Sequence, residues 1–146
     1  MRMGAVDGPD ISFSVKPIGV VRSELRDRDA APKQGDEGAP EAAVVIGSNY
    51  MPSLEETRPG DEVILLTWFH LADRGVQTVH PRGDPSRPPA GVFATRSPDR
   101  PNPIGMHRVT VLGIKGNEIH VSGLEAIDGT PVIDIKPVLG ADAADR

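Results

Sequence analysis

Short runs of β-branched and other apolar residues, each bounded by glycine, proline or aspartate, constrain the fold of this chain more than any other feature. Runs of this length and composition are typical of β-strands. Apolar residues almost nowhere recur with the period of an α-helix. About seven or eight such runs predict an all-β fold, a small closed or nearly closed β-barrel with long ordered loops. The expected strands are residues 13–21, 43–46, 62–70, 76–79, 91–95, 106–114, 118–122 and 132–137.

The connections between these strands differ in kind. Residues 22–41 are polar, charged and too long for a hairpin turn, which predicts either an ordered functional loop or a flexible one. Ser53 is expected to cap one helical turn that ends at Thr57. Residues 115–117, with the sequence KGN, have the composition of a hairpin turn because glycine and asparagine adopt positive φ readily.

For two of the expected strands, the sequence also predicts which faces are buried and which are polar. Residues 62–70 form the most apolar run, which we expect to be buried on both faces. The last run alternates, with Ile133 and Ile135 on one face and Asp134 and Lys136 on the other. The polar pair is either a solvated strand face or part of a pocket. In a pocket, Asp134 would meet a cationic group or accept a proton.

The length of 146 residues suits one domain with a core of its own and is too short for two. We therefore expect a single domain over residues 1–146, with its core at 12–139 and flexible ends at 1–11 and 140–146. There is no cysteine, which excludes disulfides and thiolate chemistry and fits a reducing cytosol.

Charge and hydropathy limit where the protein can be located and which partners it can bind. The N-terminal residues contain no apolar signal segment, and no window approaches the roughly 18 to 20 apolar residues of a membrane helix. We expect a cytoplasmic protein without membrane association. A net charge of −5 and an aromatic content of 3% argue against a whole-surface affinity for nucleic acid, so any RNA contact must be local or delegated to a partner.

The segment 91–105, GVFATRSPDRPNPIG, joins a short expected strand to a proline-rich loop. Its prolines fix their own φ and restrict the residues before them, so the loop is stiff before any ligand binds. Arg96 and Arg100 offer planar charged forks for a carboxylate or a phosphate. Residues 80–108 hold five arginines and two acidic residues in an otherwise acidic chain, which favours an anion-binding site over a plain connector with solvated arginines.

Other catalytic chemistries find little support. The four histidines lack the compact spacing of metal ligands, so no metal site is expected. His70 ends an apolar run and is either a hydrogen-bonded core histidine or a pocket residue. Ser97 is followed by proline and lies in no GxSxG elbow, and neither a Walker nor a dinucleotide-binding glycine motif is present.

Four motifs occur in order along the chain: PIGVVRS at 17–23, APKQG at 31–35, GVFATRSPDRPNPIG at 91–105 and LEAIDGTPVIDIKP at 124–137. Together they resemble the TrmO/TsaA-like family over most of the sequence. The resemblance implies a small β-barrel that binds S-adenosylmethionine, usually at a homodimer interface. It also implies tRNA as the acceptor partner, with methyl transfer to N6 of threonylcarbamoyladenosine at position 37.

The same resemblance implies where the methyl donor binds. Arg96 would hold the donor carboxylate, backbone groups of the stiff loop would read the adenine edge, and Asp134 is the candidate for accepting the proton lost by the acceptor. Positioning would supply most of the acceleration. The implied donor-binding residues are Gln34, Gly35, His70, Leu71, Arg96, Ser97, Asn102, Gly105, Met106, Ser122 and Leu124.

Two departures from the family pattern keep alternatives open. Residues 138–140, VLG, stand where relatives have an aromatic YxPY-like stretch, and Asp99 stands where many members have an aromatic residue. Longer relatives also carry a C-terminal domain thought to help hold tRNA. The alternatives are a methyltransferase of the same fold that acts on a small molecule or another RNA, and a non-catalytic S-adenosylmethionine-binding module.

Overall fold

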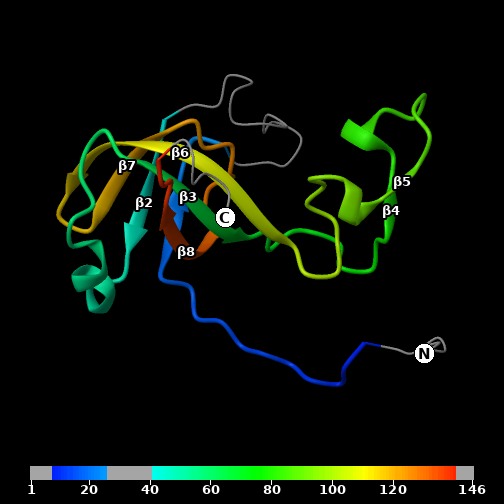
Figure 1. Cartoon of the computed structure of the whole chain (residues 1–146), viewed down its shortest axis with the longest axis horizontal. Coiled ribbons are helices and arrows are strands. Elements are labelled where there is room, and N and C mark those ends of the chain that lie inside the picture. Colours follow the sequence, from blue (N-terminus) through cyan, green and yellow to red (C-terminus); the bar gives the residue numbers. More distant parts are fainter. Residues whose placement is uncertain (1–7, 26–40, 141–146) are drawn as a thin grey trace.

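Six antiparallel strands close into a barrel in the order β1-β2-β7-β6-β3-β8 (Figure 1). The structure is a computed structural model that describes residues 8–25 and 41–140. The expected flexible ends therefore lie partly, and the loop 22–41 lies mostly, outside the described residues. The barrel strands are β1 (Gly19–Arg22), β2 (Ala42–Ile46), β3 (Glu62–Trp68), β6 (Ile104–Lys115), β7 (Glu118–Ser122) and β8 (Pro131–Pro137).

The all-β expectation is confirmed, but the barrel is smaller than predicted. Eight strands are present in the described part of the chain, of which six form the barrel. The other two, β4 (Thr78–Val79) and β5 (Ala90–Gly91), form a separate two-stranded sheet. This sheet lies in the long connection between β3 and β6, residues 69–103, which we call the lobe. Figure 1 shows the lobe projecting away from the barrel.

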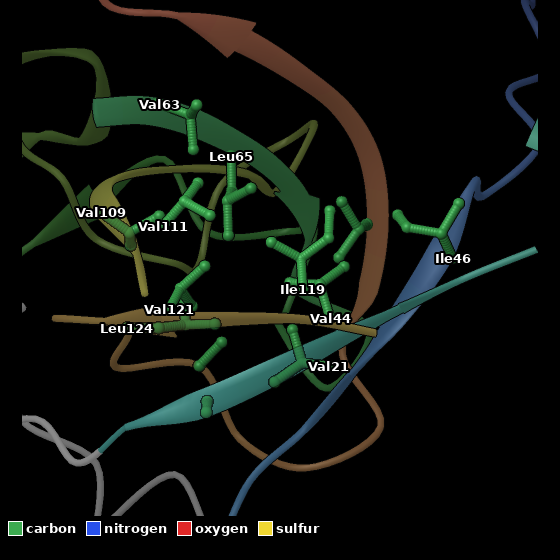
Figure 2. Packing of buried hydrophobic residues seen from close by; sticks show 13 residues of the cluster. Val21, Val44, Ile46, Val63, Leu65, Val109, Val111, Ile119, Val121 and Leu124 are labelled. Carbon is green, nitrogen blue, oxygen red and sulfur yellow. The ribbon is translucent and has the colours of Figure 1, made fainter. Parts of the chain in front are cut away.

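The barrel interior is filled by aliphatic side chains. Alternate residues of β3 point inward, so Val63, Leu65 and Thr67 are buried while their neighbours are half-exposed or exposed. The expected burial of this run on both faces is therefore wrong. Small β-branched side chains suit the narrow interior of a six-stranded barrel. The core residues are Val21, Ala42, Val44, Ile46, Val63, Leu65, Val109, Val111, Ile119, Val121, Leu124, Ala126 and Val132 (Figure 2).

Two irregularities change which residues face inward. On β8 the register with β3 shifts at Ile133, so Val132 and Ile135 both face the core although they are three residues apart. The clean alternation expected for Ile133 and Ile135 is therefore wrong. On β6 the register with β7 shifts at Leu112, which is exposed between the buried Val111 and the inward Ile114. Each shift has the form of a β-bulge, which places two residues opposite one.

Several expected elements differ from those observed. The strand expected at 13–21 is only Gly19–Arg22, because no strand of the described chain pairs with residues 13–17. Ile18 bonds to the backbone of Val132 and Gly47 directly before the strand begins. Residues 91–95 are largely a 3₁₀ turn, Val92–Ala94, and the strand expected at 76–79 is reduced to two residues. The turn expected from Ser53 is a 3₁₀ helix, Ser48–Leu54, that begins after Gly47 and has no side-chain cap.

Other predictions are confirmed. The expected strands at 43–46, 106–114, 118–122 and 132–137 fall within one or two residues of the observed ends of β2, β6, β7 and β8. Gly116 has a φ of +58° in the turn between β6 and β7, as the hairpin composition requires.

Residues 8–17 form an extended arm that precedes the barrel. Every one of them is exposed, and Phe13 keeps 90% of its surface accessible. Ile11 and Val15 are also exposed, so three large apolar side chains alternate along the arm. Figure 1 shows the arm and the lobe extending toward the same end of the molecule.

Candidate ligand-binding site

The loop that follows the 3₁₀ turn of the lobe is held together by one of its two arginines. Arg100 donates from Nη1 to the carbonyls of Ser97 at 2.9 Å and Thr95 at 3.1 Å, and from Nη2 to the carbonyl of Val92 at 3.0 Å. The expectation that Arg100 serves as a fork for a ligand is therefore wrong. Arg96 is exposed and has no hydrogen bond within the described residues, so it is the loop arginine that can meet an anion.

Side-chain hydroxyls add further support to the loop. The backbone amide of Ser97 donates to Thr95 Oγ1 at 3.1 Å, and the amide of Asp99 donates to Ser97 Oγ at 3.3 Å. These bonds and the prolines hold the loop in shape without a ligand, which supports the predicted stiffness. Ser97 is half-buried, and its hydroxyl takes part in the loop itself.

A turn after β3 lies against this loop. The amide of Phe69 donates to the carbonyl of Pro103 at 2.8 Å, and the amide of Asp73 donates to Asp99 Oδ1, also at 2.8 Å. Asp99, which departs from the family pattern, therefore caps this turn. Residues 69–75 and the loop consequently form one structural unit.

Arg74 adds a side-chain link between the two segments. It donates from Nε to the carbonyl of Pro101 at 2.7 Å and from Nη2 to Asn102 Oδ1 at 3.0 Å. Its guanidinium carbon lies 5.2 Å from the centre of the Trp68 ring, within the range of a cation–π interaction. Sequence reasoning missed Arg74, since its partners lie 27 and 28 residues further along the chain.

His70 and Leu71 lie in the same turn and are both exposed. Because His70 is exposed, it is not the hydrogen-bonded core histidine that the sequence left open as one alternative. The structure thus brings His70, Leu71 and Asn102 to one end of the barrel, as expected of residues that share a site. Gln34 and Gly35, the other predicted donor-binding residues from the APKQG motif, lie outside the described residues.

The first half of β6 offers a main-chain edge next to this loop. Ile104–Val109 pair with β3, whereas pairing with β7 begins only at Thr110, opposite Ser122. Within the described residues, one edge of this half-strand therefore has no strand beside it. The exposed side chain of Met106 lies on this segment. Leu124, also assigned to the site, has a fully buried side chain in the core, so only its backbone can reach a ligand.

Gly105 has a packing role in addition to the donor-binding role predicted for it, which stays a prediction. A Cβ at this position would lie 2.4 Å from Thr67 Oγ1, 2.4 Å from Phe69 Cζ and 2.8 Å from His107 Nε2. The absence of a side chain at Gly105 therefore makes room for these neighbours inside the barrel. Its contribution to a ligand site can come from its backbone only.

Beneath Gly105, three polar residues form a connected group. His107 is only 2% exposed, with Nε2 2.7 Å from Thr67 Oγ1 and Nδ1 2.6 Å from Glu125 Oε1. The Phe69 ring packs edge-on against the imidazole, with centroids 5.7 Å apart. We refer to Thr67, His107 and Glu125 as the polar triad. No periodic or motif signal in the sequence joined these three residues.

Asp134, the predicted proton acceptor, lies on the outer face of β8 opposite Leu66. Its Oδ2 lies 2.9 Å from Nζ of Lys136, and its Oδ1 accepts a hydrogen bond from the amide of Ile135. Both side chains of the ion pair are exposed. This geometry is that of the solvated strand face, and the catalytic role of Asp134 stays a prediction.

A pocket lies where the lobe meets the proline loop. It has a volume of about 190 Å³ and is lined by Gln77, Gly91, Val92, Phe93 and Pro101. Pockets that enclose a cofactor-sized molecule typically measure about 300 to 1,000 Å³, so this one is too small for such a ligand. Elsewhere in the lobe, hydrogen bonds from the hydroxyl and the amide of Ser86 hold the pKa of Asp84 below its usual value.

Two further features are absent from residues 8–25 and 41–140. No group of three or more histidine and carboxylate side chains comes together there in a way that could hold a metal ion. No helix in this part of the chain is both long and apolar enough to cross a membrane.

The fold and this end of the barrel define the class of the protein: a small all-β barrel with a stiff, arginine-bearing loop beside a strand edge that no strand of the described residues covers. The model of the tRNA-methyltransferase O N-terminal domain family matches residues 20–143, and the chain belongs to this family. The resemblance found in the sequence motifs is thereby confirmed.

Individual relatives agree with this assignment. The chain is 42% identical over 128 residues to a probable S-adenosyl-L-methionine-binding protein of Methanothermobacter thermautotrophicus, covering 88% of this chain and 91% of the relative. It is 40% identical over 122 residues to an S-adenosyl-L-methionine-binding protein of Archaeoglobus fulgidus, covering 84% and 86%. A crystal structure of TrmO from Pseudomonas aeruginosa superposes with a TM-score of 0.72 at 34% identity, covering 92% of this chain. The matched region is 60% of that TrmO chain, so this protein corresponds to only part of it.

Proposed function

We propose that this protein is an S-adenosylmethionine-dependent methyltransferase whose donor binds at the end of the barrel formed by the turn 69–75, the proline loop and the first half of β6. Membership of a family described as a tRNA-methyltransferase domain supports the reaction class. The names of the two archaeal relatives support the donor.

The observation that carries the proposal is the contrast between the two loop arginines. The guanidinium of Arg100 donates hydrogen bonds to three backbone carbonyls, whereas Arg96 is exposed and has no partner among the described residues. A permanently charged guanidinium on a stiff loop fits the carboxylate of an amino-acid moiety. The free edge of β6 offers main-chain donors and acceptors of the kind that can read an adenine.

For methyl transfer, the main task of the protein is to align the donor with the acceptor. When bound, S-adenosylmethionine supplies a methyl group on a positively charged sulfur, and that charge disappears as the methyl group leaves. The stiff loop lowers the ordering cost of binding and fixes the direction of attack. His70, Leu71 and Asn102 lie where they could complete the donor site, with Asn102 held in place by Arg74.

For the acceptor we propose tRNA, with N6 of threonylcarbamoyladenosine at position 37 as the methylated atom. The family description supports this substrate class. The excess of arginine over acidic residues in residues 80–108 favours an anionic partner, and Arg96 is exposed there without a partner among the described residues. A small molecule or another RNA is the alternative acceptor, and a donor-binding module without turnover is the alternative from a different class.

We also propose that the protein acts as a homodimer. The arm exposes Ile11, Phe13 and Val15, and the lobe exposes Phe93 at 83%. Exposed apolar side chains that gather in a patch mark association surfaces, and we propose that these four contribute to one.

Calorimetric titration with S-adenosylmethionine, followed by measurement of S-adenosylhomocysteine on addition of bulk tRNA, tests the function. We expect micromolar binding, with product formed only when tRNA is present. Binding with product formed from another acceptor would replace tRNA as the proposed substrate. Binding without any product would favour the non-catalytic module. Absence of binding would overturn the proposed function.

A further inference from the structure

The polar triad is a second chemical feature at the same end of the barrel. His107 lies on β6, Thr67 on β3, and Glu125 on the connection between β7 and β8. A buried imidazole in an otherwise aliphatic interior is costly unless both ring nitrogens are hydrogen-bonded. Both are bonded here, to Thr67 and to Glu125.

The partners determine the direction of each hydrogen bond when the ring is neutral. Glu125 as a carboxylate can only accept, so Nδ1 of His107 carries the hydrogen of their 2.6 Å bond. In the neutral imidazole, Nε2 is then an acceptor, and the hydroxyl of Thr67 donates to it at 2.7 Å. The triad is satisfied in this state with a defined direction for every hydrogen bond. The imidazole therefore holds Glu125 through one carboxylate oxygen.

Glu125 lies at the rim, whereas the rest of the triad is inside. Its side chain keeps 18% of its surface exposed, compared with 1% for that of His107. The neighbours Leu124 and Ala126 are both buried in the core, which fixes the backbone on either side. Oε2 of Glu125 has no hydrogen bond within the described residues. One carboxylate oxygen is thus anchored while the other remains available.

The arrangement uses several residues to hold one carboxylate. Gly105 must lack a side chain so that Thr67, Phe69 and His107 fit beneath it. Gly105 also belongs to the half-strand whose free edge borders the proposed donor site. The anchored carboxylate is therefore next to the segment that we assign to the donor.

We propose that Glu125 is the catalytic carboxylate that receives the proton released by the acceptor, and that His107 and Thr67 position it. This inference rests on the proposed methyltransferase function. A nitrogen next to a carbonyl group is a weak nucleophile, so removal of its proton assists the attack. Asp134 is less suited to this role, because Lys136 already pairs with its carboxylate on the exposed face of β8.

The acceptor nitrogen forms a bond to the methyl carbon as the bond between that carbon and the sulfonium sulfur breaks, and the electron pair of the broken bond stays on sulfur as a neutral thioether. The nitrogen loses its proton to Oε2 of Glu125. The protonated carboxyl returns the proton to water after the product leaves.

The test compares the wild-type protein with Glu125→Gln under single-turnover conditions, using S-adenosylmethionine and bulk tRNA across a range of pH. Glutamine keeps the shape of the side chain, and its amide oxygen can still accept from Nδ1 of His107. We expect unchanged donor affinity by calorimetry, a rate lowered about 100-fold or more, and loss of the acidic limb of the pH–rate profile. Glu62→Gln, which removes one charge from an exposed pair with Arg108, is the matched control and should keep the wild-type profile.

The positioning role is tested separately with Thr67→Val, which keeps the buried volume and removes the hydroxyl. We expect a lower rate and a displaced midpoint of the acidic limb, with donor affinity retained. A change in thermal stability alone, with a wild-type profile, would show that Thr67 only fills the core and would overturn its positioning role.

The two proposals fail in different ways. If the wild-type protein binds the donor but transfers no methyl group, both the methyltransferase function and the role of Glu125 are overturned. If the wild-type protein is active and Glu125→Gln has the same rate and profile, only the role of Glu125 is overturned. Weakened donor binding without loss of the acidic limb would reassign Glu125 to the donor site and would likewise overturn its role as proton acceptor.

Discussion

The guanidinium of Arg100 lies 2.9 Å from the carbonyl oxygen of Ser97, in the loop that also carries Arg96. Two arginines four residues apart thus have opposite roles, one holding the backbone and the other exposed. Their substitution should separate binding from folding.

Arg96→Ala should leave the fold intact and weaken binding of S-adenosylmethionine. Loss of a charge-assisted hydrogen bond corresponds to about 1.5 to 3 kcal/mol, or roughly a tenfold to 150-fold rise in Kd. Calorimetric titration measures the affinity, and the melting temperature serves as the check on folding. An unchanged Kd would remove Arg96 from the donor site.

Arg100→Ala should destabilise the loop itself. The carbonyls of Val92, Thr95 and Ser97 lose their donor, which should lower the free energy of unfolding by about 1 to 3 kcal/mol. Urea unfolding measures this loss, and limited proteolysis should show faster cleavage within the loop. A variant as stable and as resistant as wild type would contradict the holding role of Arg100.

Gly105→Ala should strain the barrel interior, because the new Cβ would lie 2.4 Å from both Thr67 Oγ1 and Phe69 Cζ. Overpacking of this kind costs about 1 to 3 kcal/mol. Gly113→Ala is the matched control on the same strand, since a Cβ there has nothing within 4 Å. Equal unfolding midpoints for the two variants in urea would refute the packing role of Gly105.

Arg74→Ala should weaken donor binding without contact between Arg74 and the donor. The loop would lose the hydrogen bonds to Pro101 and Asn102 that tie it to the turn after β3. We expect a several-fold rise in Kd from the added ordering cost. Arg87→Ala, which removes a 3.8 Å contact with Asp84 on the lobe, is the control and should bind as wild type does.

Phe13→Ser should shift the protein toward monomer at micromolar concentration, because the side chain exposed on the arm would be buried between two copies. Sedimentation equilibrium measures the change in mass. Leu112→Ser replaces an exposed apolar residue on the β6 bulge and should leave the dimer intact. A monomeric wild-type protein would overturn the proposed homodimer.

The sequence allowed the all-β class and most barrel strands to be predicted because each strand is a β-branched run with turn residues at its ends. The strand predicted at residues 13–18 is absent, since the alternation of Phe13 and Val15 in the sequence is the same whether or not a neighbouring strand exists. The bulges at Leu112 and Ile133 were also hidden, because they depend on the register between two strands.

For the candidate site, too, features set by the local sequence could be predicted and features set by the folded chain could not. The stiffness of the proline loop follows from local chemistry and could be predicted. Which arginine would be exposed could not, because the carbonyls that engage Arg100 become available only once the chain turns back on itself. The polar triad was inaccessible for a similar reason, since Thr67, His107 and Glu125 come from three separate segments.

Trp68 is the single tryptophan of the chain, and the hydrophobic core cluster of the described residues consists of aliphatic side chains. It lies at the end of β3, under the guanidinium of Arg74, in the unit formed by the turn and the loop. Its fluorescence therefore originates beside the candidate site and not in the barrel interior. The protein carries a native optical reporter there, whose emission should respond to ligand titration without any added label.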